Sequence, residues 1–281
     1  MPITKTVAFL GERRRTGFST RPSRRWLHSA GSPAAVALLV GDIGARQPVP
    51  APTRTRAVPT RDGWTVTGSK IWTSHAQHSH HLLALVRTGQ RGEKASTALT
   101  QMIVDLAQPG VTVRPIRTLD GREHFCEVFF DDVFVPADRV LGAPGSGWKQ
   151  VLGELGFERS GPERFLSTFP LPAATAHEGA ADPDFGHLVA QLVVLRSMSA
   201  RVGKHLGDNE APGVAAAVVK DLGTAFEQDT LDVAREWLSQ HPAPDLAELF
   251  AQAQTHSPGF TLRGGASEIM RDIIARSEGL A

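Results

Sequence analysis

The chain has 281 residues, of which 41% are hydrophobic, and a formal net charge of +1. Its length predicts one large or two moderate domains, and its longest purely apolar run, residues 34–40, is far below the roughly 20 residues that cross a bilayer and lacks the layout of a signal peptide. A single cysteine, Cys126, excludes an internal disulfide framework and predicts a buried thiol in a reducing, cytoplasmic compartment.

The first part of the chain differs in charge from the rest. Residues 1–56 hold ten Lys and Arg against two acids, a net +8, whereas residues 57–281 hold twenty against twenty-seven, a net −7. Residues 1–53 are rich in Arg, Ser, Pro and Gly and show no sustained helical or strand period. We expect a poorly ordered basic segment without a nucleic-acid partner; a mitochondrial transit peptide and a nucleic-acid-binding arm are the alternatives.

Residues 54–145 have the pattern of a β domain. Short runs rich in β-branched and aromatic residues are separated by turn signals such as Asp62-Gly63, Pro109-Gly110 and Asp120-Gly121. The runs cover residues 64–67, 70–74, 82–87, 99–106, 111–116 and 125–130. Short strands with a turn about every ten residues predict an antiparallel β-barrel or sandwich.

Residues 146–281 change to a helical period. One apolar stripe runs from Leu188 to Leu206, and a second contains Val218, Leu222, Phe226 and Trp237. A short last helix is expected after Gly265. Strands followed by helices predict an α+β fold, with the helices paired as an antiparallel bundle.

Three motifs along residues 54–281 resemble, in order and spacing, those of the acyl-CoA dehydrogenases. They are GSKIWTS at residues 68–74, VFFDDVFVP at 128–136 with GSGW at 145–148, and GGASEIMR at 264–271. Each motif alone is weak, but three in the right order are specific.

The resemblance implies FAD, an acyl-CoA thioester as substrate, and an electron-transfer flavoprotein or similar acceptor. It also implies an oligomer, because the family shares its helical bundle and its FAD site across subunits. In this chemistry a base takes the α-proton while the β-hydride leaves for the flavin, and preorganised donors meet the developing oxyanion. A carboxylate in a water-excluded pocket suits the base.

The position of that base is exchanged in this sequence. Many members of the family carry the catalytic Glu directly before the Gly of the last motif, where this chain has Gly264. A second branch, resembling the isovaleryl and long-chain enzymes, carries it before an Arg on the first long helix of the C-terminal domain, and Glu158-Arg159 matches that placement. The resemblance therefore implies Glu158 as base, against the alternative of a solvated charge near a helix start. Glu154 and Glu163 are the competing acids.

The remaining site residues are also implied by the resemblance. The N–H of Gly264 would help polarise the thioester carbonyl, and Gly265 would offer a free N–H to the cofactor where a helix opens. Trp72, Thr73 and Ser74 match the positions that contact the flavin, and Arg159 matches one near the acyl-CoA. The histidines at positions 75, 78, 80 and 81 lack the spacing of a metal site, so we expect no metal.

Three features of the family are missing. Residues 1–53 show no N-terminal helical domain, which suggests a shifted or truncated reading frame. The acidic stretch that normally precedes the segment around Thr53-Arg54 and the elements that reach a neighbour's FAD have no match. The alternatives to an active dehydrogenase are therefore a noncatalytic subunit that pairs with a complete paralogue and an oxidase that forms peroxide.

Overall fold

The computed structural model describes residues 36–39, 53–90, 93–208, 210 and 212–280. The predictions for residues 1–53 lie outside these ranges, except for Thr53 and the backbone of strand β1 (Val36–Leu39). Contacts divide the chain into two compact units, Met1–Val151 and Leu152–Ala281, and each is described by itself.

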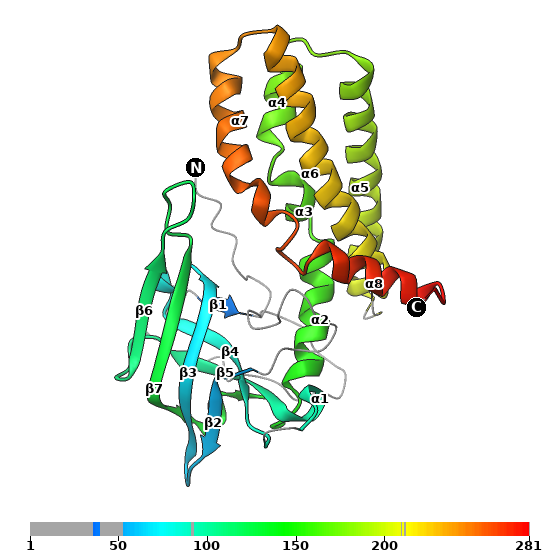
Figure 1. Cartoon of the computed structure of the whole chain (residues 1–281). Helices are drawn as coiled ribbons and strands as arrows, with labels where there is room; N and C mark the ends of the chain where they lie inside the picture. Colours follow the sequence, from blue (N-terminus) through cyan, green and yellow to red (C-terminus); the bar gives the residue numbers. More distant parts are fainter. Residues whose placement is uncertain (1–35, 40–52, 91–92, 209, 211, 281) are drawn as a thin grey trace. The chain divides into compact units, whose positions relative to one another are not determined.

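The first unit contains one sheet with the order β6-β7-β3-β2-β4-β5-β8, to which β1 adds by pairing with β4 (Figure 1). Its strands are β2 (Arg56–Pro59), β3 (Gly63–Ser74), β4 (His81–Arg87), β5 (Leu99–Asp105), β6 (Val111–Ile116), β7 (Phe125–Pro136) and β8 (Val140–Leu141). Short helical turns are α1 (Ala95–Ala98), η2 (Ala76–His78) and η3 (Ala137–Arg139). The described sheet is open, because β6 and β8 end the path, so of the two predicted forms, a barrel or a sandwich, a closed barrel is not formed by the described strands.

The sheet is also mixed rather than wholly antiparallel. Most neighbours are antiparallel, as predicted, but β4 pairs in parallel with both β1 and β2. Alternate residues of β7 are buried, at positions 126, 128 and 130 and again at 133 and 135, and they belong to a mainly aliphatic core that includes Phe130. Cys126 is fully buried in this core, as predicted.

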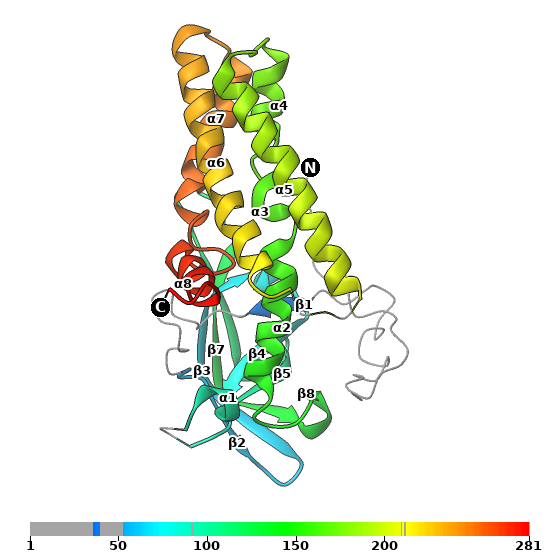
Figure 2. The same cartoon turned by 90° about the vertical axis from the view of Figure 1, so that its right-hand side faces the viewer.

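The second unit is helical. Its elements are the end of α2 (Gly147–Ser160), then α3 (Glu163–Leu166), α4 (Pro170–His177), α5 (Pro183–Gly207), α6 (Ala215–Gln240), α7 (Pro244–His256), η4 (Ser257–Gly259) and α8 (Ser267–Ser277). Helices α5 and α6 lie side by side as a long antiparallel pair, and α4 and α7 pack on α6 (Figure 2). The α+β class predicted from the sequence is therefore confirmed.

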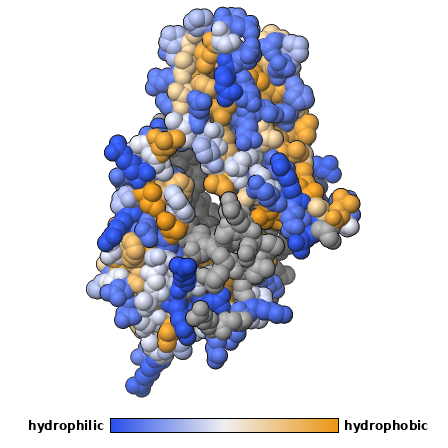
Figure 3. Space-filling model, in the orientation of Figure 1, coloured by the Kyte–Doolittle hydropathy of each residue, from blue (hydrophilic) through white to orange (hydrophobic). Residues whose placement is uncertain are grey.

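Helix α5 shows why the sequence folds this way. Asp182 caps it by accepting a hydrogen bond of 2.9 Å from the N–H of Phe185, and Pro183 occupies the first helical position. Its predicted apolar face is confirmed, since Leu188, Leu195 and Val202 are all buried. The outer surface of the unit mixes hydrophilic residues with apolar ones that remain exposed (Figure 3). No described helix is both long and apolar enough to cross a membrane.

The apolar face of α6 is rotated from the predicted one. Phe226 is buried as expected, but Leu222 is 46% exposed and the polar residues Lys220 and Glu227 are fully buried instead. Hydropathy alone places buried charges on the wrong face of a helix, because it assigns them to solvent.

Candidate active site

The predicted site residues fall into two groups. Trp72, Thr73 and Ser74 belong to the first unit, whereas Glu158, Arg159, Gly264 and Gly265 belong to the second. The second group comes from distant parts of the sequence, the end of α2 and the loop before α8.

Glu158 and Arg159 lie in the last turn of α2, not near a helix start as the alternative interpretation required. The helix ends at Ser160, and Gly161-Pro162 follows, where proline disfavours helical backbone in the residue before it. A carboxylate in the last turn faces the negative end of the helix dipole. Glu158 is therefore not placed to complement the dipole of its own helix, and its stabilisation comes from elsewhere.

The partner of Glu158 is Arg164 on α3. Arg164 Nη2 lies 2.9 Å from Glu158 Oε1, and the Arg164 side chain is only 13% exposed. The second carboxylate oxygen, Oε2, is buried and has no hydrogen-bond donor among the described residues. Oε1 is thus bound by the Arg164 cation, whereas Oε2 can still accept a hydrogen bond or a proton.

The carboxylate of Glu158 occupies the space that a side chain at position 264 would take. A Cβ on Gly264 would lie 2.8 Å from Glu158 Oε2 and 3.2 Å from Glu158 Oε1. The two positions that the sequence suggested had exchanged a carboxylate are therefore spatial neighbours.

The backbone at this point is suited to present a donor. Gly264 and Gly265 have φ values of +71° and +106°, in the region that favours glycine. The carbonyl of Gly264 accepts a hydrogen bond of 3.0 Å from Arg159 Nε. Its N–H makes no hydrogen bond to another described residue, so it is available to a ligand oxygen.

Several charged residues near this centre were not found from the sequence. Arg263 directly precedes Gly264 and donates to both carboxylate oxygens of the fully buried Glu227, which also accepts from Ser167 Oγ. Lys220 is fully buried, and desolvation lowers its pKa to about 8. Burial also raises the pKa of Glu227, which Arg263 opposes. The only sequence signal was polar residues spaced along one face of α6.

The predicted cofactor residues lie where β3 departs from regular pairing. Between Lys70 and Thr73 the register with β7 shifts, so that three steps along β3 match two along β7. Within this bulge Trp72 has a φ of +64° and is 53% exposed as a residue, and its ring lies edge-on to that of Phe125, with 5.7 Å between the ring centroids. An exposed aromatic ring could stack on a planar ligand such as a flavin, and Ser74, two residues further on, is partly exposed. Thr73 is fully buried, with its Oγ1 unpaired among the described side chains.

The histidine cluster does not converge on one point. His75 packs edge-on against His124 at 4.1 Å, and burial lowers the pKa of His81. No group of three or more His, Cys, Asp or Glu among the described residues is arranged to hold a metal.

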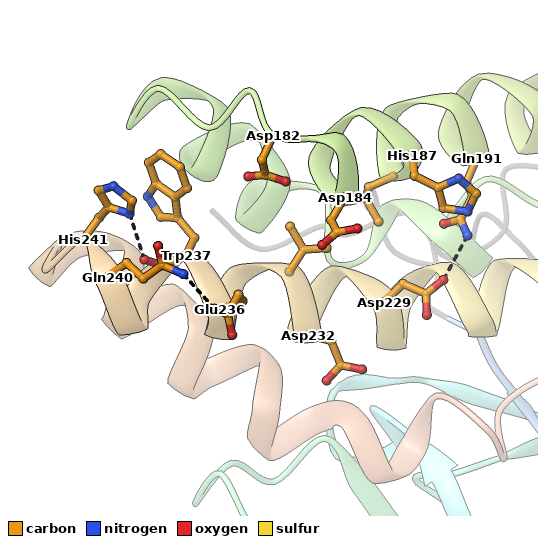
Figure 4. Close-up of a pocket in the computed structure, with 12 residues that line it drawn as sticks. Asp182, Asp184, His187, Gln191, Asp229, Asp232, Glu236, Trp237, Gln240 and His241 are labelled. Carbon is orange, nitrogen blue, oxygen red and sulfur yellow. Dashed lines mark hydrogen bonds between the residues drawn. The ribbon is translucent and has the colours of Figure 1, made fainter.

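A separate groove of about 770 Å³ lies between α5 and α6 (Figure 4). Its acidic lining is Asp182, Asp184, Asp229, Asp232 and Glu236. None of the predicted site residues lines this groove, and its carboxylates are spread along both helices rather than gathered at a centre.

Two family models show the class to which this chain belongs. The family model of the acyl-CoA dehydrogenase middle domain matches residues 41–133, and the model of the acyl-CoA dehydrogenase C-terminal domain matches residues 177–279. Together these regions cover more than half of the chain, which belongs to the acyl-CoA dehydrogenase family. Gly264 and Gly265 lie inside the second region, whereas Glu158 and Arg159 lie between the two.

Curated relatives agree with this assignment. The chain is 32% identical over 242 residues to acyl-CoA dehydrogenase IpdE1 of Mycolicibacterium smegmatis, covering 75% of the chain and 56% of the relative. It is 31% identical over 243 residues to acyl-CoA dehydrogenase FadE29 of Mycobacterium tuberculosis, covering 80% of the chain and 62% of the relative. The chain thus spans little more than half the length of these relatives.

Solved structures share the fold. A probable acyl-CoA dehydrogenase from Mycobacterium abscessus superposes with a TM-score of 0.75 at 20% identity, covering 88% of this chain and 69% of that one. The ChsE4–ChsE5 complex from Mycobacterium tuberculosis superposes with a TM-score of 0.72 at 22% identity, with the same coverage.

Proposed function

We propose that this chain catalyses the FAD-dependent α,β-dehydrogenation of an acyl-CoA thioester, with Glu158 as the base. One observation carries the proposal. The Glu158 carboxylate occupies the space of a side chain at position 264, with Oε2 2.8 Å from the position of a Cβ on Gly264. A base on α2 therefore reaches the place where a Glu at position 264 would put its own side chain.

The residues of the second unit divide the chemistry between them. Arg164 fixes one oxygen of Glu158 and leaves Oε2 free to accept the α-proton. The unpaired N–H of Gly264 donates to the thioester oxygen, where negative charge develops as the α-proton leaves. Arg159 binds the carbonyl of the same residue, on the other side of its Cα, and so restricts the backbone from which that N–H projects.

The residues of the first unit supply the cofactor side of the proposal. FAD, when bound, accepts the hydride from the β-carbon. Trp72, an exposed aromatic residue, would contact its ring system, and the partly exposed Ser74 would offer its hydroxyl to it. Contacts of FAD with Thr73 and Gly265, and of the acyl-CoA with Arg159, remain predictions.

The decisive variant is Glu158→Gln, which keeps the shape of the side chain and removes its basicity. We expect unchanged flavin content and a rate of flavin bleaching by acyl-CoA that falls by about 10²- to 10⁴-fold, the usual contribution of a general base. Glu154→Gln, four residues earlier on α2, is the control and retains bleaching. Full turnover by Glu158→Gln would reject Glu158 as the base, and peroxide formation in air would identify an oxidase.

A second candidate function is that of a noncatalytic subunit in a pair with a complete paralogue. One observation favours it: a solved structure of the same fold is a complex of two chains, ChsE4–ChsE5. If this candidate is correct, the chain copurifies with a second dehydrogenase chain, and Glu158→Gln leaves the activity of the pair intact.

Oligomerisation and a redox partner complete the proposal. Helix α5 leaves Val189, Val193 and Val194 exposed, an apolar face that favours a further copy or a paralogous chain. An electron-transfer flavoprotein or similar acceptor would reoxidise the flavin. Light scattering tests the first point, and reoxidation by an added acceptor flavoprotein tests the second.

A further inference from the structure

Helix α6 buries a stripe of polar side chains that faces the loop before α8. Lys220, Thr224 and Glu227 are spaced by four and then three residues, so they lie on one helical face. All three are at most 4% exposed. We call these three residues the polar stripe.

Each member of the polar stripe binds the segment 260–263. Thr224 Oγ1 donates to the carbonyl of Phe260 at 3.2 Å, and Lys220 Nζ lies 3.5 Å from the carbonyl oxygen of Thr261. Glu227 accepts from the guanidinium of Arg263. Three contacts from one helix face, to residues 260, 261 and 263, thus hold the segment that directly precedes Gly264.

Burying the charged members of the polar stripe costs free energy that an apolar helix contact would not. Buried charges are stabilised only when they are paired and hydrogen-bonded, and apolar residues of similar volume often serve packing equally well. Glu227 meets this requirement through Arg263 and Ser167, and Lys220 remains buried with a lowered pKa. A stripe used only for packing would not need these groups.

We propose that the polar stripe is a positioning device for the backbone donor at Gly264. Gly264 and Gly265 have φ values of +71° and +106°, and glycine has little conformational preference of its own, so the direction of the Gly264 N–H is set by what holds the neighbouring residues. The polar stripe holds the segment before Gly264, and Arg159 holds its carbonyl. This role rests on the proposed function of the Gly264 N–H.

Ser167 extends the same network toward the base. It follows α3, which carries Arg164, the partner of Glu158, and its hydroxyl donates to Glu227. Glu227 therefore ties together the segment that ends in the donor and the segment that orients the base.

The test compares two buried threonines of α6. Thr224→Val removes the hydroxyl that binds the loop, whereas Thr230→Val removes one whose Oγ1 donates to Phe226 O at 2.8 Å within α6 itself. Hydrogen–deuterium exchange of the peptide covering residues 260–266 is expected to become about three- to tenfold faster in Thr224→Val, the effect of losing one buried hydrogen bond. Thr230→Val is expected to leave this exchange unchanged, and Thr224→Ser to restore it.

Kinetic measurements distinguish a role in positioning the Gly264 N–H from a role in folding. In the FAD-loaded protein, Thr224→Val is expected to lower the limiting rate of flavin bleaching while the half-saturating acyl-CoA concentration stays the same, because the donor acts mainly on developing charge. Equal exchange in both valine variants, or faster exchange with an unchanged limiting rate, would overturn the proposal. If the wild-type protein does not bleach at all, the proposed function fails, and the exchange data alone decide whether the polar stripe orders the loop.

Discussion

Arg159 Nε donates a hydrogen bond to the carbonyl oxygen of Gly264 over 3.0 Å and so joins two residues that are 105 positions apart in the sequence. The same guanidinium lies 3.4 Å, through Nη2, from the place that a Cβ on Gly265 would take. The residue next to the proposed base thus binds the same glycine that carries the proposed backbone donor.

Replacing Arg159 by Met keeps most of the aliphatic stem and removes the donor. We expect the free energy of unfolding to fall by about 1–3 kcal/mol, the usual effect of losing a hydrogen bond from a charged group. Arg235→Met is the control, because Arg235 is 54% exposed and its pair with Asp232 contributes little. Urea denaturation of both variants measures the difference, and equal stabilities would show that the bond to Gly264 is unimportant.

Gly264→Ala tests how tightly the carboxylate fills the adjacent space. The new Cβ would lie 2.8 Å from Glu158 Oε2, and the alanine would have to adopt a φ of +71°. Gly179→Ala isolates the backbone strain, because Gly179 has a φ of +93° and nothing within 4 Å of the added Cβ. We expect both variants to lose about 1–2 kcal/mol from the left-handed backbone, with a further loss only at position 264. A calorimetric melt that gives the same loss at both positions would contradict this.

A double variant can place the carboxylate at position 264 instead of position 158. Glu158→Gly combined with Gly264→Glu removes the crowding that Gly264→Glu alone creates, and it places a carboxylate near the same point. We expect the single Gly264→Glu variant to lose flavin bleaching and the double variant to regain part of it. Stopped-flow absorbance measures both, with Glu158→Gly as the reference for the missing base.

Lys220 predicts a pH dependence of stability. Its pKa is lowered to about 8 in the folded chain, chiefly by desolvation, with Asp221 acting in the opposite direction. Between that value and the ordinary pKa of about 10.4, the unfolded chain binds a proton that the folded chain does not, so stability rises with pH across this window. We expect the stability of the wild type relative to Lys220→Met to improve between those pH values. The chain has no tyrosine, which removes one titration from the same range; a constant difference would contradict the lowered pKa.

Trp72 should matter more for the cofactor than for folding. Because Trp72 is 53% exposed as a residue, we expect Trp72→Ala to change the melting temperature little and to lower the flavin content of the purified protein. Leu119→Ala, at an 80% exposed position of the same unit, should change neither property. Visible absorbance relative to protein concentration gives the flavin content, and full retention by Trp72→Ala would remove Trp72 from the proposed cofactor site.

The sequence predicted the parts of this fold that depend on local patterns. Alternation and turn residues located the strands, and the apolar stripe of Leu188, Leu195 and Val202 located the buried face of α5. Whether the sheet closes was not predictable in this way. Closure depends on whether the two edge strands pair with each other, which the residue pattern within a strand does not determine. The parallel pairing of β4 with β1 and β2 is likewise a matter of long-range topology.

The candidate site was predictable only through resemblance. Nothing in the spacing of Glu158 and Gly264 indicates that they are neighbours; the structure places them together because the loop before α8 returns to the end of α2. Arg164, Lys220 and Glu227 were missed, since a charge in a helical pattern is normally read as solvated. Their burial is explained by partners on other segments, such as Arg263, that a local reading cannot supply.

The paired glycines before α8 have a consequence for the history of this lineage. Any single substitution that placed an acid at position 264 would meet both a left-handed backbone and an occupied volume, while loss of the acid at position 158 alone would remove the proposed base. Two coordinated changes would be needed to cross between the arrangements. Descendants of an ancestor with this geometry should therefore keep the pair together, so that Gly at one position and Glu at the other are inherited as a unit.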